Sequence, residues 1–155
     1  MTLNKEPTDI TVLVHDVVNS FSKQAEHRKV SIRVEMPPDI PLIDVDPVRI
    51  REVFANLLSN GLNHTSTGGT IRVKSEVSNQ RLLVSVADSG SGIAPEALPK
   101  IFDRFYKGAG SRGSGLGLII ARNLVALHNG EIRAESREGH GTTVTVELPV
   151  SATSE

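Results

Sequence analysis

Three asparagines, Asn56, Asn60 and Asn63, lie four and then three residues apart in the stretch from residue 49 to residue 66. At about 100° per helical residue, all three fall within about 60° of arc on one helix face. Asparagine is a poor helix former, and exposed faces usually carry Glu, Lys or Gln instead. An amide oxygen suits Mg²⁺, which needs only one or two protein ligands beside phosphates and water. The stripe indicates either a metal–phosphate site or a solvated polar face, and alone it does not separate the two.

A second candidate is Asp88, which closes a predicted strand and is followed by Gly90 and Gly92. Glycine at this spacing lets the backbone turn sharply and lets a ligand come close. A carboxylate dehydrated by its surroundings can accept a hydrogen bond from an exocyclic amine such as that of adenine. The pattern is short, and a turn with a solvated aspartate satisfies it equally well.

A further glycine-rich segment, residues 110–122, leads directly into an apolar helix. Gly113, Gly115 and Gly117 expose backbone N–H groups and the positive end of the helix dipole, which suits a phosphate group. No Gly-Lys-Ser/Thr run follows, so this is not a Walker A loop, and its late position excludes a Rossmann fingerprint. The alternative is a glycine cluster that serves only to pack the helix.

Basic residues lie between these two segments, in a Gly-, Pro- and Ser-rich region of residues 89–115 that holds Arg104, Lys107 and Arg112. Such cations can neutralise a terminal phosphate when a loop closes, with Phe102 and Phe105 as apolar anchors. Lone basic loop residues are usually solvated, so this prediction depends on the neighbouring motifs.

The hydrophobic pattern predicts the elements that position these motifs. One helix is expected from Asp9 into the charged run at 26–29, a second from Asp46–Pro47 through the asparagine stripe, and a third over 116–128. Strands are expected over 31–36, 70–77, 81–88, 131–136 and 142–149. The predicted core residues of the last two helices are Ile50, Val53, Phe54, Leu57, Leu58 and Leu62, then Leu118, Ile119, Leu124, Val125 and Leu127. This order favours an α/β (α+β) two-layer sandwich, with about three helices on one face of a mixed sheet. Residues 1–8 are assigned to a linker or tail, 9–150 to one domain and 151–155 to a C-terminal tail.

The amino-acid composition argues against several classes of partner and site. With 17 basic and 18 acidic residues among 155, nothing favours nucleic acid or a membrane surface as a partner. The absence of cysteine excludes disulfides and thiolate metal sites. No apolar run reaches transmembrane length and the N-terminus lacks a signal-peptide pattern, so a cytoplasmic domain is expected.

Taken in order, NLLSN, DSGSG, IFDRFYKG and GSGLGL resemble the N, G1, F and G2 boxes of the catalytic, ATP-binding domain of bacterial two-component sensor histidine kinases. EGHGTTVTVELP is similar to the terminal strand region of that family, and the resemblance covers residues 9 to 149. It implies a Bergerat-type fold, ATP and Mg²⁺ as cofactors, and transfer of the γ-phosphoryl group to a histidine on a dimerisation domain. It also implies a downstream response regulator, and a place in the cytoplasmic part of a membrane-anchored sensor.

The resemblance implies roles residue by residue. Asn60 matches the Mg²⁺ ligand, with Asn56 one turn earlier; Asp88 matches the carboxylate that reads the adenine amine, and Thr142 the threonine that supports it. The other implied nucleotide-binding residues are Asn63, His64, Gly90, Gly92, Ile93, Gly113, Gly115, Leu116 and Gly117; Asn56, Arg104 and Lys107 are implied as catalytic.

Three positions depart from the family pattern. Asn63 stands where many members have a lysine, so phosphate neutralisation would fall more on Mg²⁺ and on Arg104 or Lys107. His64 stands where many have a tyrosine, and histidine can stack on a base as well. Gly61 replaces the usual alanine, at a helix cost of about 1 kcal/mol.

Asn56 also bears on the reaction. Gyrase-type and MutL-type ATPases of the same superfamily carry a glutamate there as general base, and an amide cannot take a proton near neutral pH. Glu52, one turn earlier, is the only substitute and is interpreted as a surface residue. None of the five histidines (His15, His27, His64, His128 and His140) lies in a phosphoacceptor motif. We therefore expect a chain that binds ATP·Mg²⁺ but does not phosphorylate itself, as an excised domain or a stand-alone catalytic subunit. The alternatives are a nucleotide-binding regulatory module and an anti-sigma-type serine kinase of the same superfamily.

Overall fold

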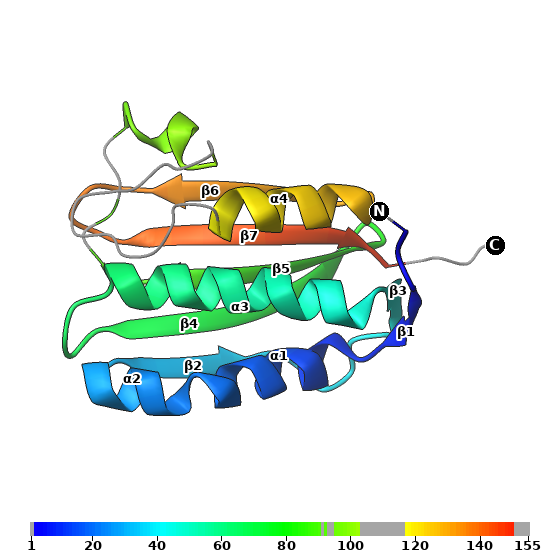
Figure 1. Cartoon of the computed structure of the whole chain (residues 1–155), viewed down its shortest axis with the longest axis horizontal. Coiled ribbons are helices and arrows are strands. Elements are labelled where there is room, and N and C mark those ends of the chain that lie inside the picture. Colours follow the sequence, from blue (N-terminus) through cyan, green and yellow to red (C-terminus); the bar gives the residue numbers. More distant parts are fainter. Residues whose placement is uncertain (1, 91, 93–94, 103–116, 151–155) are drawn as a thin grey trace.

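A computed structural model describes residues 2–90, 92, 95–102 and 117–150. Within them, a five-stranded sheet in the order β2-β4-β5-β7-β6 carries helices on one face (Figure 1). The strands are β1 (Glu6–Thr8), β2 (Ser31–Glu35), β3 (Ile43–Val45), β4 (Thr70–Ser78), β5 (Arg81–Asp88), β6 (Glu131–Ser136) and β7 (Thr142–Pro149); the helices are α1 (Ile10–Ser20), α2 (Ser22–Arg28), α3 (Pro47–His64) and α4 (Gly117–Leu127), with a 3-10 turn η1 (Leu98–Lys100). The predicted two-layer α/β sandwich is confirmed.

The sheet is mixed, as predicted. β2 and β4 run parallel, whereas β4–β5, β5–β7 and β6–β7 are antiparallel. The β4–β5 hairpin turns through two residues in the left-handed region, Asn79 with φ 54° and Gln80 with φ 62°. Two consecutive positive φ values match the right-handed twist of the flanking strands.

The core lies between the sheet and the helix layer. Every residue assigned to the apolar side of α3 is buried, because Ile50, Val53, Phe54, Leu57, Leu58 and Leu62 face the strands. The helix starts as predicted: the Asp46 carboxylate accepts from the N–H groups of Val48 (3.1 Å) and Arg49 (3.3 Å), with Pro47 at the first position. No helix within the described residues is long and apolar enough to cross a membrane.

Two predictions about helix residues need correction. The first helix is divided at Phe21 into α1 and α2. Leu127, which was predicted to be in the core, is 43% exposed. On α4 the buried stripe consists of Ala121, Leu124 and Val125, and it continues into buried His128, so the helix turns Leu127 outward.

The N-terminal segment is ordered, although the sequence gives no sign of it. β1 pairs antiparallel with β3, and the Asn4 N–H donates to Asp46 Oδ2 at 3.0 Å. Hydrogen bonds from backbone N–H groups, that of Asn4 first, hold the pKa of the Asp46 carboxyl below its usual value. These contacts attach the N-terminal segment to Asp46, the N-cap residue of α3.

His128 joins the ends of two helices. It is 2% exposed, its Nε2 accepts from the Asp46 N–H at 3.1 Å, and its Nδ1 lies 2.7 Å from the carbonyl oxygen of Leu124. Since Nε2 must accept, the neutral ring carries its proton on Nδ1 and donates it to Leu124. This buried bridge ties the end of α4 to the start of α3.

Candidate functional site

Asp88 is the centre of the site, at the end of β5. Its Oδ1 accepts from the N–H groups of Gly90 (2.9 Å) and Thr142 (3.3 Å). Burial raises the pKa of this carboxyl, and the two backbone hydrogen bonds and nearby His64 partly oppose that rise. Oδ2 has no hydrogen-bond partner among the residues that the structure describes. One oxygen is held by the backbone, and the other is available to accept from a ligand.

Glycines form the rim of this site by bringing backbone against backbone. A Cβ on Gly90 would collide with the carbonyl oxygen of His64, and one on Gly141 with that of Asp88. Gly92 likewise lies against the carbonyl of Arg137, and both Gly92 (φ +77°) and Gly141 (φ +92°) have left-handed backbones. Only glycine permits these approaches, and the roles of Gly90 and Gly92 at a nucleotide pocket stay predictions.

The asparagine stripe lies along α3 between β5 and α4. Asn56, Asn60, Asn63 and His64 are all half-buried. Asn56 lies at the N-terminal end of the stripe. A Cβ built on Gly117 would lie 3.8 Å from Asn56 Cβ, so Asn56 packs against the first turn of α4. The Asn56 Nδ2 is buried and has no partner in the described chain. A buried amide donor without a partner at a helix N-terminus is suited to an anionic group.

Some predicted site residues cannot be placed. Ile93, Arg104, Lys107, Gly113, Gly115 and Leu116 lie outside the described residues, as do Phe105 and Arg112. At the near edge of that gap, the Arg122 guanidinium of α4 lies 5.9 Å from the ring centroid of Phe102. This cation–π distance attaches the start of the F-box segment to α4.

Sequence analysis missed one residue of the site, Ser136 on β6. Its hydroxyl donates to the carbonyl oxygen of Gly141 at 3.0 Å and lies 2.8 Å from the Thr142 hydroxyl. A signal was present, because Ser136 and Thr142 flank a short glycine-containing turn, and their separation places them opposite each other in a hairpin.

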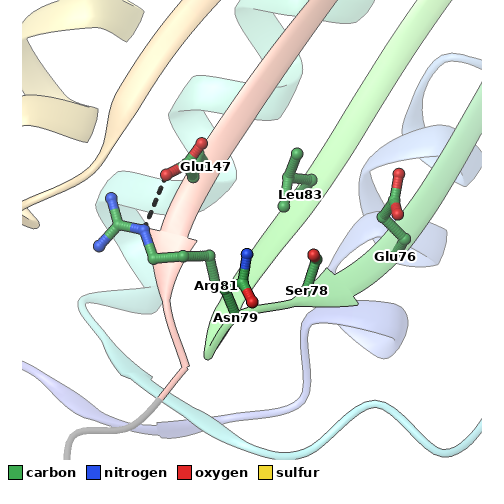
Figure 2. Close-up of a pocket in the computed structure, with 6 residues that line it drawn as sticks. All are labelled: Glu76, Ser78, Asn79, Arg81, Leu83 and Glu147. Atoms are coloured by element: carbon green, nitrogen blue, oxygen red, sulfur yellow. Dashed lines mark hydrogen bonds and ion pairs between the residues drawn. The ribbon is translucent and has the colours of Figure 1, made fainter.

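A separate depression lies toward the opposite end of β5. Glu76, Ser78, Asn79, Arg81, Leu83 and Glu147 line it, and Figure 2 shows Arg81 turned toward Glu147. Glu147 binds Arg81 at 2.8 Å and Arg133 at 3.0 Å, and hydrogen bonds from Arg133 and Arg81 lower its pKa. Both oxygens of Glu147 are engaged, unlike Oδ2 of Asp88.

An ATP-binding fold family is defined by this sheet, these helices and this site. Residues 45–152 match the model of the histidine kinase-, DNA gyrase B- and HSP90-like ATPases, and the chain belongs to that family. It is 34% identical over 151 residues to the signal transduction histidine-protein kinase BaeS of Escherichia coli K12, covering 94% of this chain and 32% of BaeS. The chain thus spans about a third of the length of this relative.

Solved structures place the chain within the histidine kinase branch. The nucleotide-free catalytic domain of histidine kinase ThkA is 30% identical with a TM-score of 0.85, covering 95% of this chain and 98% of that domain. Full-length ShkA in complex with AMPPNP is 28% identical with a TM-score of 0.90, covering all of this chain and 33% of ShkA. The predicted resemblance to the catalytic domain of sensor histidine kinases is confirmed.

Proposed function

We propose that this domain binds ATP·Mg²⁺ and transfers the γ-phosphoryl group to a histidine on a dimerisation and phosphoacceptor domain of a two-component system. The observation that carries the proposal is the state of Asp88. Its Oδ1 is held by two backbone N–H groups, and its Oδ2 is left to accept from a donor such as the adenine amine. Gly90 and Gly141 let backbone pack directly against backbone beside this carboxylate.

The remaining residues fit the rest of the nucleotide. Asn56 offers a buried Nδ2 without a partner beside the first turn of α4, where the helix dipole favours phosphate. Asn60 lies one turn later on the same stripe, and its amide oxygen is a suitable ligand for Mg²⁺. Bound Mg²⁺ would neutralise charge on the phosphates. Asn63 supplies no charge, so we assign cationic help to Arg104 and Lys107.

Phosphoryl transfer is favoured over hydrolysis because position 56 holds an amide. Glu52 is the nearest carboxylate on the stripe, but its side chain is 43% exposed and lies 3.9 Å from Arg49. A solvated carboxylate paired with arginine is a poor general base for a bound water. The nucleophile must then come from another domain, here a histidine in cis or in trans.

A response regulator is the proposed downstream partner. ThkA has been solved in complex with the response regulator protein TrrA. Charge and composition provide no reason to add nucleic acid or direct membrane contact to the partners of this domain.

Transfer can be tested with γ-labelled ATP, Mg²⁺ and a separately expressed dimerisation domain from a candidate cognate kinase. We expect acid-labile, base-stable phosphate on the dimerisation domain, none on this chain alone, and none with Asn60→Ala. Val77→Ala, an exposed change on β4 away from the site, is the matched control and should transfer normally. Tight ATP binding without transfer to any candidate would instead favour a regulatory nucleotide-binding module.

A further inference from the structure

All α-helices of the described chain lie on one face of the sheet, which leaves the opposite face uncovered by them (Figure 1). Side chains alternate between the two faces along each strand. Because Val73, Val84 and Val146 belong to the core, their neighbours in sequence project from the uncovered face. Figure 2 shows two of these neighbours, Leu83 of β5 and Glu147 of β7, which are paired. We call this surface, made of the residues of β2, β4, β5, β7 and β6 that alternate with core residues, the open face.

Two rows of residues cross the open face from one edge strand to the other. Taken from β2 to β6 through directly paired positions, the first row is Arg33, Arg72, Ala87, Thr143 and Glu135. The second row is Glu35, Lys74, Ser85, Thr145 and Arg133. In both rows the two edge strands carry opposite charges, one arginine and one glutamate, and the order of the charges is reversed from one row to the next.

The charges at the two ends of the first row lack a partner within the described chain. Arg33 lies directly opposite Arg72, and like charges at such positions destabilise a sheet. Glu35, on the same strand as Arg33, already contacts Arg72 at 3.4 Å and Lys74 at 3.9 Å. Neither Arg33 nor Glu135 forms an ion pair with another residue that the structure describes. The two lie four strand spacings apart, about 19 Å, so they cannot pair with each other within one chain.

The middle of the open face carries short side chains. Ala87 and Ser85 lie on β5, the middle strand of the five, and Thr143 and Thr145 are paired with them on β7. All four are half-buried, whereas the charged residues of the two edge strands are exposed. Short side chains in the middle let a second sheet approach until the longer charged side chains at the edges meet.

A second copy of the chain satisfies these charges if the two open faces meet about a twofold axis parallel to the strands and centred on β5. That axis reverses the order β2-β4-β5-β7-β6, so β2 of one copy lies over β6 of the other. Arg33 then meets Glu135 of the second copy. In the next row Glu35 meets Arg133 of the second copy, and the symmetry produces each contact twice. Packed sheets lie about 10 Å apart, a gap that arginine and glutamate side chains together span.

One contact between like charges remains about this axis, beside the second row. Glu76 of β4 comes over Glu147 of the second copy. Glu147 is already bound by Arg81 at 2.8 Å and by Arg133 at 3.0 Å, so little of its negative charge is left to repel Glu76. Between these two positions, Leu83 of β5 meets its own copy across the axis and adds an apolar contact.

Twofold axes that run across the strands fit the charges less well. An axis through the second row would bring Glu35, Lys74 and Arg133 each against its own copy. An axis midway between the two rows would bring Arg72 against Lys74 of the second copy. Like charges placed against each other in an interface are unfavourable. The charge pattern therefore favours the axis parallel to the strands.

We propose that the open face is a homodimer interface, in which a second copy of this chain packs sheet against sheet about the axis parallel to the strands. The interface uses none of the residues assigned to nucleotide binding, so it goes beyond the proposed function and does not depend on it. Five strands spaced about 4.8 Å apart give a contact about 20 Å wide, and roughly 1,000 Å² of surface is buried in total. That area is at the lower limit for a specific interface, so the dimer exchanges with the monomer.

Charge exchange between two chains tests the interface and its axis together. Arg33→Glu places like charges against Glu135 of the second copy, and Glu135→Arg does the same against Arg33. Each variant alone should therefore associate about ten- to hundredfold more weakly than the wild type. An equimolar mixture should associate as tightly as the wild type, because the heterodimer regains both attractive contacts. Sedimentation velocity of the full chain at up to about 1 mM protein and about 50 mM salt measures the association.

Two further variants control for the change of charge and for folding. Lys23→Glu makes the same change of charge at an exposed residue of α2, in the helix layer, and should leave association unchanged. Ser85→Arg sets like charges against each other at the axis and should weaken association by a similar factor to the edge variants. Melting temperatures show whether each variant is folded, and Ser85→Arg provides the test if an edge variant does not fold.

The interface is supported if the wild type dimerises, the single variants associate more weakly and their mixture restores the dimer. A wild type that stays monomeric at about 1 mM overturns the proposal and leaves the open face to a partner of another kind. A dimer that is insensitive to Arg33→Glu also overturns it, as does a mixture that associates no more tightly than the separate variants, because the contact then lies elsewhere or follows another axis. The proposed function is tested by phosphoryl transfer and is independent of each of these outcomes.

Discussion

Replacing Asp88 by asparagine should change stability and nucleotide affinity in opposite directions. Burial raises the pKa of Asp88, so the ionised carboxylate is less favourable in the folded chain than in water. A group with a raised folded pKa stabilises the fold fully only below its unfolded pKa, and that contribution is lost as pH rises through the folded value. Asparagine keeps an oxygen for the N–H groups of Gly90 and Thr142 and removes the charge. Nucleotide-free Asp88→Asn should therefore melt at a higher temperature than the wild type at neutral pH.

Affinity should fall, because the ligand loses a charged acceptor. A hydrogen bond to a charged group is worth about 1.5–3 kcal/mol, which corresponds to about a 10- to 150-fold weaker Kd for ATP. An amide at this position can also turn its NH₂ toward the adenine amine, which places the loss toward the upper part of that range. At saturating ATP the order of melting temperatures should thus reverse.

The assay is thermal unfolding of the Asp88→Asn and wild-type proteins from about pH 4 to pH 8, with and without Mg·ATP, plus calorimetric Kd values. The nucleotide-free difference should shrink as pH falls through the raised folded pKa of Asp88, because the wild-type carboxyl then becomes neutral as well. Asp44→Asn, an exposed change on β3, controls for loss of one negative charge. The reasoning fails if nucleotide-free Asp88→Asn melts below the wild type by an amount independent of pH, or if its Kd for ATP is unchanged.

Three further changes test other parts of the site. Asn56→Glu supplies a carboxylate where hydrolases of the superfamily carry their base, and basal phosphate release should rise by about 100-fold, the lower end of general-base effects; a flat rate would show that position 56 does not decide the reaction. Gly90→Ala drives a methyl group into the His64 carbonyl, so ATP binding measured by calorimetry should be lost, and wild-type affinity would refute the close approach. His128→Ala leaves the buried Asp46 N–H without an acceptor and opens a cavity, which should lower the free energy of unfolding by about 2–4 kcal/mol in urea titrations; a loss below about 0.5 kcal/mol would argue against the bridge.

Local sequence signals predicted the elements that carry the site. α3 could be predicted because an N-cap residue, a proline and an apolar stripe all occur in one segment. The Asp46 side chain accepts hydrogen bonds from N–H groups of the first turn. β5 and β7 could be predicted because their residues alternate between a buried face and a half-buried one. Asp88 closes such a strand and is followed by two glycines, so its position at the end of β5 could be predicted as well.

Features that depend on distant partners were not predictable. β1 and β3 are three residues each, too short to alternate, and their pairing joins residues far apart in the sequence, such as Glu6 and Val45. The contact between Ser136 and Thr142 depends on the register that places β6 against β7, which residue type does not show. His128 ends a helical pattern that also fits Leu127, and its hydrogen bond with the Asp46 N–H joins residues far apart in the sequence, which residue type does not show.

The glycine rim has a consequence for the entropy of binding. Gly90, Gly92 and Gly141 bring main chain against main chain, so that side of the site has almost no rotatable side-chain bonds to immobilise when a ligand enters. Each long side chain that is ordered on binding costs about 0.5–1.5 kcal/mol, and the glycine rim adds little to that cost. The glycine rim is therefore a preorganised surface. Evolutionary changes that tighten or weaken binding can act mainly through residues of the helix face, such as Asn63.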